Sequence, residues 1–191
     1  GVMARTVEDC SLLVHAVSGR ALPDFAAAPP HAPRIGLCRT SRWKDASPDT
    51  QALLERTAAA LSGKGAAVHE VELPPGFDRL YEDHVLIMNF EAARGLAWER
   101  FNHPDLLSDH LRNTLAAAAA TPREKYDEAM RHARVCRQTV AGIFVDCDVL
   151  LTPSATGEAP AGIESCGSSL FNRCWTLLGV PCVTLPMGRG A

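Results

Sequence analysis

Two short apolar runs near the end of the chain, each closed by a proline, limit the possible folds most strongly. The first is Val149-Leu150-Leu151-Thr152-Pro153, and the second is Val180-Pro181-Cys182-Val183-Thr184-Leu185-Pro186. Between them lie a loop rich in glycine, proline and serine and an amphipathic stretch, Phe171–Leu178. Short apolar runs bounded by turn residues are typical of buried strands. This part of the sequence therefore predicts a strand, a loop, a short helix and a second strand.

An earlier strand–helix–strand unit points to the same architecture. Arg34–Arg39 is a short apolar segment that predicts a strand. Ser47-Pro48 supplies an N-cap and a first helical residue, and this helix should run to about Gly63. Ala67–Leu73 alternates between apolar and polar side chains, as strands do. Two strands joined through a helix favour a right-handed parallel crossover.

Residues 77–146 should be a helical region. A first helix is predicted over Phe77–Phe101, and His103-Pro104 should end it. A second helix is predicted over Leu106–Ala120. Thr121-Pro122-Arg123-Glu124 then has the pattern of a capping box, which predicts the start of a third helix.

Strands and helices thus alternate along the chain, which predicts an α/β fold with a mostly parallel, mixed sheet flanked by helices. Before the first strand, Thr6 should cap a helix, and residues 20–33, with four prolines, should form a surface linker. The 191 residues fit a single α/β domain, 1–191. The chain has no initiator methionine and stops just after an apolar run, so we interpret it as the C-terminal portion of a larger domain, present only in part.

Composition excludes several classes of function. The net charge of −3 gives no reason to expect nucleic acid as a partner. No apolar run approaches the ~20 residues that cross a bilayer, so we expect no membrane association. The seven cysteines are scattered, which is typical of reduced core thiols in a cytoplasmic protein. No histidine or cysteine spacing matches a metal site, and we expect neither a metal nor a cofactor.

Candidate binding residues follow the first of the two late strands. Ligands of open parallel sheets bind outside the carboxyl ends of the strands. Thr152, Pro153 and Ser154 stand at such an end, and the two hydroxyl groups could face a polar ligand. Threonine and serine also simply cap turns, which is the structural alternative for this loop.

Three blocks of the chain, residues 1–17, 146–160 and 170–188, resemble the amidase signature family of serine hydrolases. The first block opens as Gly1-Val2-Met3-Ala4-Arg5-Thr6-Val7-Glu8-Asp9, with Val2 where the family usually has proline. The last contains Phe171-Asn172-Arg173-Cys174-Trp175-Thr176-Leu177-Leu178-Gly179. The resemblance implies the hydrolysis of a carbon–nitrogen amide bond through an acyl-enzyme on a serine.

In that family a serine, a cis-peptide serine and a lysine carry the reaction, and all three precede the block that opens this chain. The resemblance therefore implies no catalytic residue here. It implies that Thr152, Pro153, Ser154, Asn172 and Trp175 line the substrate cleft. It also implies a small-molecule amide substrate for the complete enzyme, and a fragment that is inactive alone. Because one sheet edge would lack its neighbour, we expect a homo-oligomer or association with the missing N-terminal half.

Two other functions stay open at this point. The chain could be a non-catalytic binding or regulatory protein on the same scaffold. It could also be an unrelated α/β enzyme with a cysteine nucleophile, since cysteine and histidine partners meet only in space. His84 and Asn89 are further candidates, because polar groups on an apolar helix need partners. A buried tryptophan such as Trp175 is usually core, which is the structural alternative for that residue.

Overall fold

The computed structural model describes residues 1–27 and 31–188. It divides into two compact units, Gly1–Ala32 and Pro33–Ala191. The first unit contains one helix, α1 (Val7–Ser18), in its described part. As predicted, Thr6 is its N-cap, and the Thr6 hydroxyl accepts a hydrogen bond from the Asp9 N–H at 3.1 Å. Residues 28–30 of the predicted linker 20–33 lie outside the described residues.

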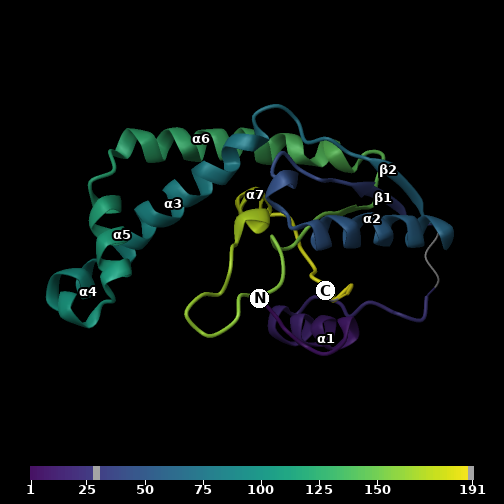
Figure 1. The fold of residues 1–191 in the computed structure, drawn as a ribbon, viewed down its shortest axis with the longest axis horizontal. Coiled ribbons are helices and arrows are strands. Elements are labelled where there is room, and N and C mark those ends of the chain that lie inside the picture. The colour runs from purple at the N-terminus through teal and green to yellow at the C-terminus, as the bar shows by residue number, and fades with distance from the viewer. Residues whose placement is uncertain (28–30, 189–191) are drawn as a thin grey trace. The chain divides into compact units, whose positions relative to one another are not determined.

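The second unit is built on a three-stranded parallel sheet with the order β2-β1-β3 (Figure 1). The strands are β1 (Arg34–Leu37), β2 (Ala67–Glu70) and β3 (Val149–Leu151). Ile35 of the central strand is paired with Val68 on one side and with Val149 on the other. The predicted α/β class and the parallel strands are therefore confirmed.

Helix α2 (Pro48–Gly63) connects β1 to β2 and packs against β2. Its start follows directly from local sequence chemistry. Ser47 is the N-cap, its hydroxyl accepts from the Thr50 N–H at 3.2 Å, and Pro48 occupies the first turn. Leu54 and Ala58 turn inward and form a small core with Leu37 of the sheet.

The seam between β1 and β3 is held by side chains as well as by the strand pairing. The Arg34 backbone N–H donates to an Asp148 carboxylate oxygen at 2.9 Å, and the Arg34 guanidinium donates to the other oxygen at 2.7 Å. The Asp148 N–H donates to the Arg34 carbonyl at 2.8 Å. These contacts join residues that are 114 positions apart in the sequence.

A helical region follows β2, as predicted. Helix α3 (Leu80–Gly95) is its centre and packs against α5 (Asp109–Ala119), α6 (Arg123–Thr139) and the late helix α7 (Arg173–Leu178) (Figure 1). None of the helices in residues 1–27 and 31–188 has the length and apolar character needed to cross a membrane. The region consists of η2 (Phe77–Arg79), α3 (Leu80–Gly95), α4 (Ala97–Asn102), η3 (Pro104–Leu106), α5 (Asp109–Ala119), α6 (Arg123–Thr139) and η4 (Val140–Phe144).

The capping box predicted at Thr121–Glu124 is wrong. Pro122 is the N-cap of α6, and no side chain caps this end of the helix. The Thr121 N–H instead donates to the Ala118 carbonyl, in the turn that ends α5. Thr121 therefore closes the preceding helix and stands one residue too early to cap the next.

The chain ends with η5 (Leu170–Asn172), α7 (Arg173–Leu178) and an extended tail. The strand predicted for Val180–Pro186 is wrong: among the described residues this segment belongs to no sheet. Val183 and Leu185 are 75% and 50% exposed, so no neighbouring layer covers them here. Pro181 and Pro186 also lack the N–H that a ladder needs.

Candidate functional site

Two loops meet at the carboxyl edge of the sheet. The loop after β3 starts with Thr152, Pro153 and Ser154, and the loop after the central strand β1 starts at Cys38. The Cys38 N–H donates to the Leu151 carbonyl at 2.9 Å. The loop after β3 is also anchored to the start of α2, because the Ser47 N–H donates to the Thr156 carbonyl at 2.6 Å. This is the edge at which open parallel sheets bind ligands.

A side-chain hydrogen bond joins two of the predicted site segments. The Asn172 side-chain amide donates to the Ser154 carbonyl at 2.8 Å. Asn172 stands at the junction of η5 and α7, so this bond fixes the late helix against the loop after β3. The side chains of Ser154 and Asn172 are both exposed.

The other predicted site residues lie deeper. Pro153 is buried, Thr152 is half-buried, and Trp175 is only 4% exposed and packs in the main core. The Thr152 hydroxyl oxygen and the Trp175 indole nitrogen are buried without a hydrogen-bond partner among the described residues. Buried polar groups are normally paired, so both atoms mark a place where a further partner would gain hydrogen bonds.

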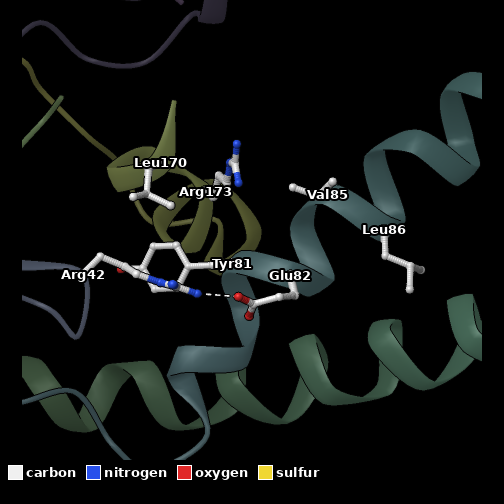
Figure 2. A pocket seen from close by; sticks show the side chains of 7 residues that line it. All are labelled: Arg42, Tyr81, Glu82, Val85, Leu86, Leu170 and Arg173. Carbon is white, nitrogen blue, oxygen red and sulfur yellow. Dashed lines mark hydrogen bonds and ion pairs between the residues drawn. The ribbon is translucent and has the colours of Figure 1, made fainter. Parts of the chain in front are cut away.

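A hollow of about 400 Å³ is lined by residues of α3, η5 and α7 together with Arg42. Figure 2 shows Arg42 lying across the Tyr81 ring with its guanidinium directed to Glu82, while the side chain of Arg173 projects from α7 nearby. None of the predicted site residues lines the hollow, although Arg173 follows Asn172 directly and Leu170 stands two residues before it. Arg42 was not among the predicted site residues, although it follows the central strand and the same rule about strand ends applies to it. The lining residues are Arg42, Tyr81, Glu82, Val85, Leu86, Leu170 and Arg173.

Burial sets the protonation of the groups behind this hollow. Burial raises the pKa of the Tyr81 hydroxyl far above its usual value, and burial raises the pKa of Cys174 to about 11. The Cys174 thiol lies 3.5 Å from the Tyr81 hydroxyl oxygen. Both groups are therefore protonated at neutral pH, so neither a phenolate nor a thiolate is present there.

His84 also lies near the hollow and is kept neutral. Burial lowers the pKa of His84, and the positive charge of Arg173 lowers it further. The His84 Nδ1 atom is buried and has no hydrogen-bond partner among the described residues. Asn89, the other polar candidate on α3, is half-buried and shows no comparable feature in the described part of the chain.

A separate buried group links α3 to α6. The Asp83 carboxylate is 3% exposed; it accepts from the Arg79 Nε at 3.2 Å and lies 2.6 Å from the His132 Nδ1. The other ring nitrogen of His132 lies 3.6 Å from the Cys136 sulfur. Within the described residues, no group of histidine, cysteine and carboxylate side chains is arranged to hold a metal ion.

Comparison with known proteins identifies the family. The family model described as Amidase matches residues 1–186. The chain belongs to the amidase family. The match also includes the residues between 17 and 146, which lie outside the three blocks that carry the sequence resemblance. The resemblance to the amidase signature family is thereby confirmed.

Curated relatives of this amidase-family chain include one component of the glutamyl-tRNA(Gln) amidotransferases. The protein from Neisseria gonorrhoeae is 27% identical over 231 residues, which cover 98% of this chain and 48% of that protein. The mitochondrial counterpart from Xenopus laevis is 25% identical, and the match covers 98% of this chain and 45% of that protein. The chain thus spans about half the length of these relatives.

Solved structures share the fold. A crystal structure of an amidase superposes with a TM-score of 0.75 at 22% identity, covering 93% of this chain and 42% of that one. A chain from a vestigial protein complex, linked to the origins of an s-triazine catabolic enzyme, gives a TM-score of 0.74 at 20% identity; the match covers 92% of this chain and 43% of that one. A bacterial aryl acylamidase of the amidase signature family gives 0.65 at 19%, covering 91% and 42%. The amidase-signature fold is therefore present in part.

Proposed function

We propose that this chain forms one wall of the substrate cleft of an amide hydrolase. In this proposal the serine that carries the acyl group belongs to the part of the complete enzyme that this chain does not contain. Thr152, Pro153, Ser154, Asn172 and Trp175 line the cleft. The family membership supports the reaction class, because amide bond hydrolysis is the activity at family level.

The hydrogen bond from Asn172 to the Ser154 carbonyl is the observation that carries the proposal. It brings together the two late sequence blocks that resemble the family, at the edge of the sheet where ligands bind. The Thr152 hydroxyl lies in the same loop, is buried and has no partner among the described residues, so it would gain a hydrogen bond from an amide group that enters this loop. An amide substrate presents both a carbonyl oxygen and an N–H group, which match these needs.

The catalytic group is absent from the sequence of this chain. The family reaction needs a lysine base that deprotonates the nucleophilic serine through a bridging serine. The three lysines here, Lys44, Lys64 and Lys125, have no Gly/Ser-rich nucleophile loop at a suitable distance after them. The chain therefore supplies scaffold and cleft lining, and we expect the complete protein to act in the cytoplasm on a small-molecule amide.

A partner completes this proposal. β2 and β3 are the outer strands of the three-stranded sheet, so each presents an edge with no strand beside it among residues 1–27 and 31–188. Open strand edges are templates for pairing with another chain. The missing N-terminal half, or a second copy of this chain, is the partner that we propose. The similar chain linked to an s-triazine catabolic enzyme was itself solved in a protein complex.

Ammonia release from a simple carboxamide tests the proposal. The chain alone should release none, while the complete protein should release ammonia with a normal turnover. In the complete protein, Asn172→Ala should lower kcat/KM about 3- to 10-fold, because one hydrogen bond of about 0.5–1.5 kcal/mol is lost. Thr176→Ala is the matched control, since Thr176 is exposed on the same helix. Ammonia release by the isolated chain, or equal effects of the two variants, would contradict the proposal.

A cysteine nucleophile is the second candidate, and one observation favours it. Asp83, His132 and Cys136 follow one another in the order of a carboxylate–imidazole–thiol relay. Two facts oppose it. Cys136 is 4% exposed, and burial raises the pKa of its thiol, whereas catalytic cysteines have a lowered pKa.

Thiol labelling separates the two candidates. With iodoacetamide at pH 7, Cys136 should react roughly tenfold or more slowly than the exposed Cys166, because its thiol is buried and protonated. Peptide mass spectrometry at timed intervals gives both rates on the same sample. Faster labelling of Cys136 than of Cys166 at pH 6 would establish an activated thiol and favour the cysteine enzyme.

A further inference from the structure

The loop after the central strand holds a residue in a strained backbone conformation. Thr40 has a φ of 61°, the only positive φ outside glycine among the described residues. A β-branched residue with positive φ is a genuine outlier, and such strain collects at functional sites. The Arg42 N–H donates to the Thr40 hydroxyl at 3.2 Å. The strained loop therefore fixes Arg42 at the edge of the hollow shown in Figure 2.

The charges at the hollow do not balance. Arg42 forms an ion pair with Glu82 and lies 5.0 Å from the centre of the Tyr81 ring. Arg173, by contrast, forms no ion pair within the described residues, and its Nε reaches only the Ser169 hydroxyl at 3.5 Å. The positive charge of Arg173 also acts on His84: after burial, it is the second cause of the lowered pKa of His84. One guanidinium without a carboxylate partner is thus left at the hollow.

The remaining lining is apolar. Val85 and Leu86 from α3 and Leu170 from η5 are half-buried, and the Tyr81 ring forms the base beneath Arg42. The volume of about 400 Å³ is in the range of small-molecule sites. A hydrophobic lining with a few oriented polar groups is the usual composition of such sites.

We propose that this hollow binds an amphipathic monoanion, an aryl or alkyl carboxylic acid. Its carboxylate pairs with the Arg173 guanidinium, and its apolar part packs on Val85, Leu86 and Leu170. Arginine is suited to this role, because its planar fork of donors matches the two oxygens of a carboxylate. Arg42, already paired with Glu82, contributes shape and holds the Tyr81 ring in place. The site is a property of this chain and does not depend on the proposed hydrolysis.

Isothermal titration of the chain with 4-phenylbutyrate and with 4-phenylbutyramide tests the proposal. The two probes share the apolar part and differ in charge. The acid should bind at least tenfold more tightly than the amide, and its affinity should fall as salt is raised. Equal affinities for acid and amide, or no binding of the acid at millimolar concentration, would overturn the proposal.

Variants locate the site. Arg173→Gln should weaken the binding of 4-phenylbutyrate about tenfold or more, because a charge-assisted hydrogen bond is lost. Arg131→Gln is the matched control, since it removes the same charge from an exposed position on α6. Arg173→Lys keeps the charge and should keep part of the affinity, and circular dichroism checks the fold of each variant. Equal effects of Arg173→Gln and Arg131→Gln would refute the site. These titrations involve no turnover, so their failure and the failure of the ammonia assay are separate results.

Discussion

Replacing Trp175 by alanine should lower the free energy of unfolding of this chain by about 3–5 kcal/mol. Trp175 is 4% exposed and lies in the main core with Leu177 and Leu178. The substitution removes a large apolar surface and leaves a cavity. Helix α7 cannot move to fill this cavity, because Asn172 holds the start of the helix to the Ser154 carbonyl. Urea denaturation followed by circular dichroism at 222 nm measures the loss without relying on tryptophan fluorescence.

The phenylalanine variant at the same position separates packing from hydrogen bonding. The Trp175 indole nitrogen has no partner among the described residues, so Trp175→Phe should cost only about 1.5 kcal/mol or less. Trp98→Ala is the surface control: Trp98 is 63% exposed, and its loss should change stability by less than about 1 kcal/mol. A loss with Trp175→Ala as small as that with Trp98→Ala would show that Trp175 is not a core residue.

Replacing Asp83 by alanine should also lower the free energy of unfolding by about 3–5 kcal/mol, because the substitution removes a buried carboxylate and leaves Arg79 and His132 without this partner. The carboxylate accepts from Arg79 and contacts His132, and in this way it ties η2 and α3 to α6. The same urea titration measures the effect. The change in midpoint should come with an unchanged m-value, since the variant and the original chain expose the same surface on unfolding.

An exposed ion pair on α6 gives the comparison. Arg123 and Asp127 are in contact at 2.9 Å, and both side chains are well exposed to water. Asp127→Ala should therefore cost only about 0.2–1 kcal/mol, the usual range for surface pairs. If Asp83→Ala costs no more than Asp127→Ala, the buried cluster does not stabilise the fold.

The sequence was a sufficient guide wherever short-range chemistry decides the structure. Helix α2 starts at Pro48 after the Ser47 cap and ends at Gly63, as predicted. Helix α1 starts after Thr6 for the same reason. In both cases the deciding hydrogen bond joins residues three positions apart, so it can be inferred from the sequence alone.

The sequence was a poor guide where a residue far away along the chain decides the local structure. The segment Val180–Pro186 has the composition of a strand, yet the described chain offers it no neighbouring strand and leaves Val183 exposed. Strand propensity describes how well a side chain fits a half-buried surface, so it has no effect without that surface. The capping box at Thr121 failed for a different, local reason, because the Thr121 N–H donates to the Ala118 carbonyl in the turn that ends α5.

The candidate site shows the same division. The loop after β3 could be predicted, because the rule for strand ends needs only the position of one strand. The hollow could not, since its lining comes from three separate segments, around Arg42, Tyr81–Leu86 and Leu170–Arg173. Nothing in any one of these segments indicates that the other two are near. That Arg173 has no ion-pair partner within the described residues can be seen only when all three segments are placed together.

The pairing of β1 with β3 also bears on the order in which the sheet and the helices can form during synthesis on the ribosome. The chain emerges from its N-terminal end, so β1, α2 and β2 are available long before the residues of β3 exist. Helix α3 packs against both α5 and α6, so these three helices can assemble in that interval. Arg34 must wait for Asp148, 114 residues later, and until then one side of the central strand stays open to water. We therefore expect closure of the sheet to be a late step in folding, after α3 has packed against α5 and α6.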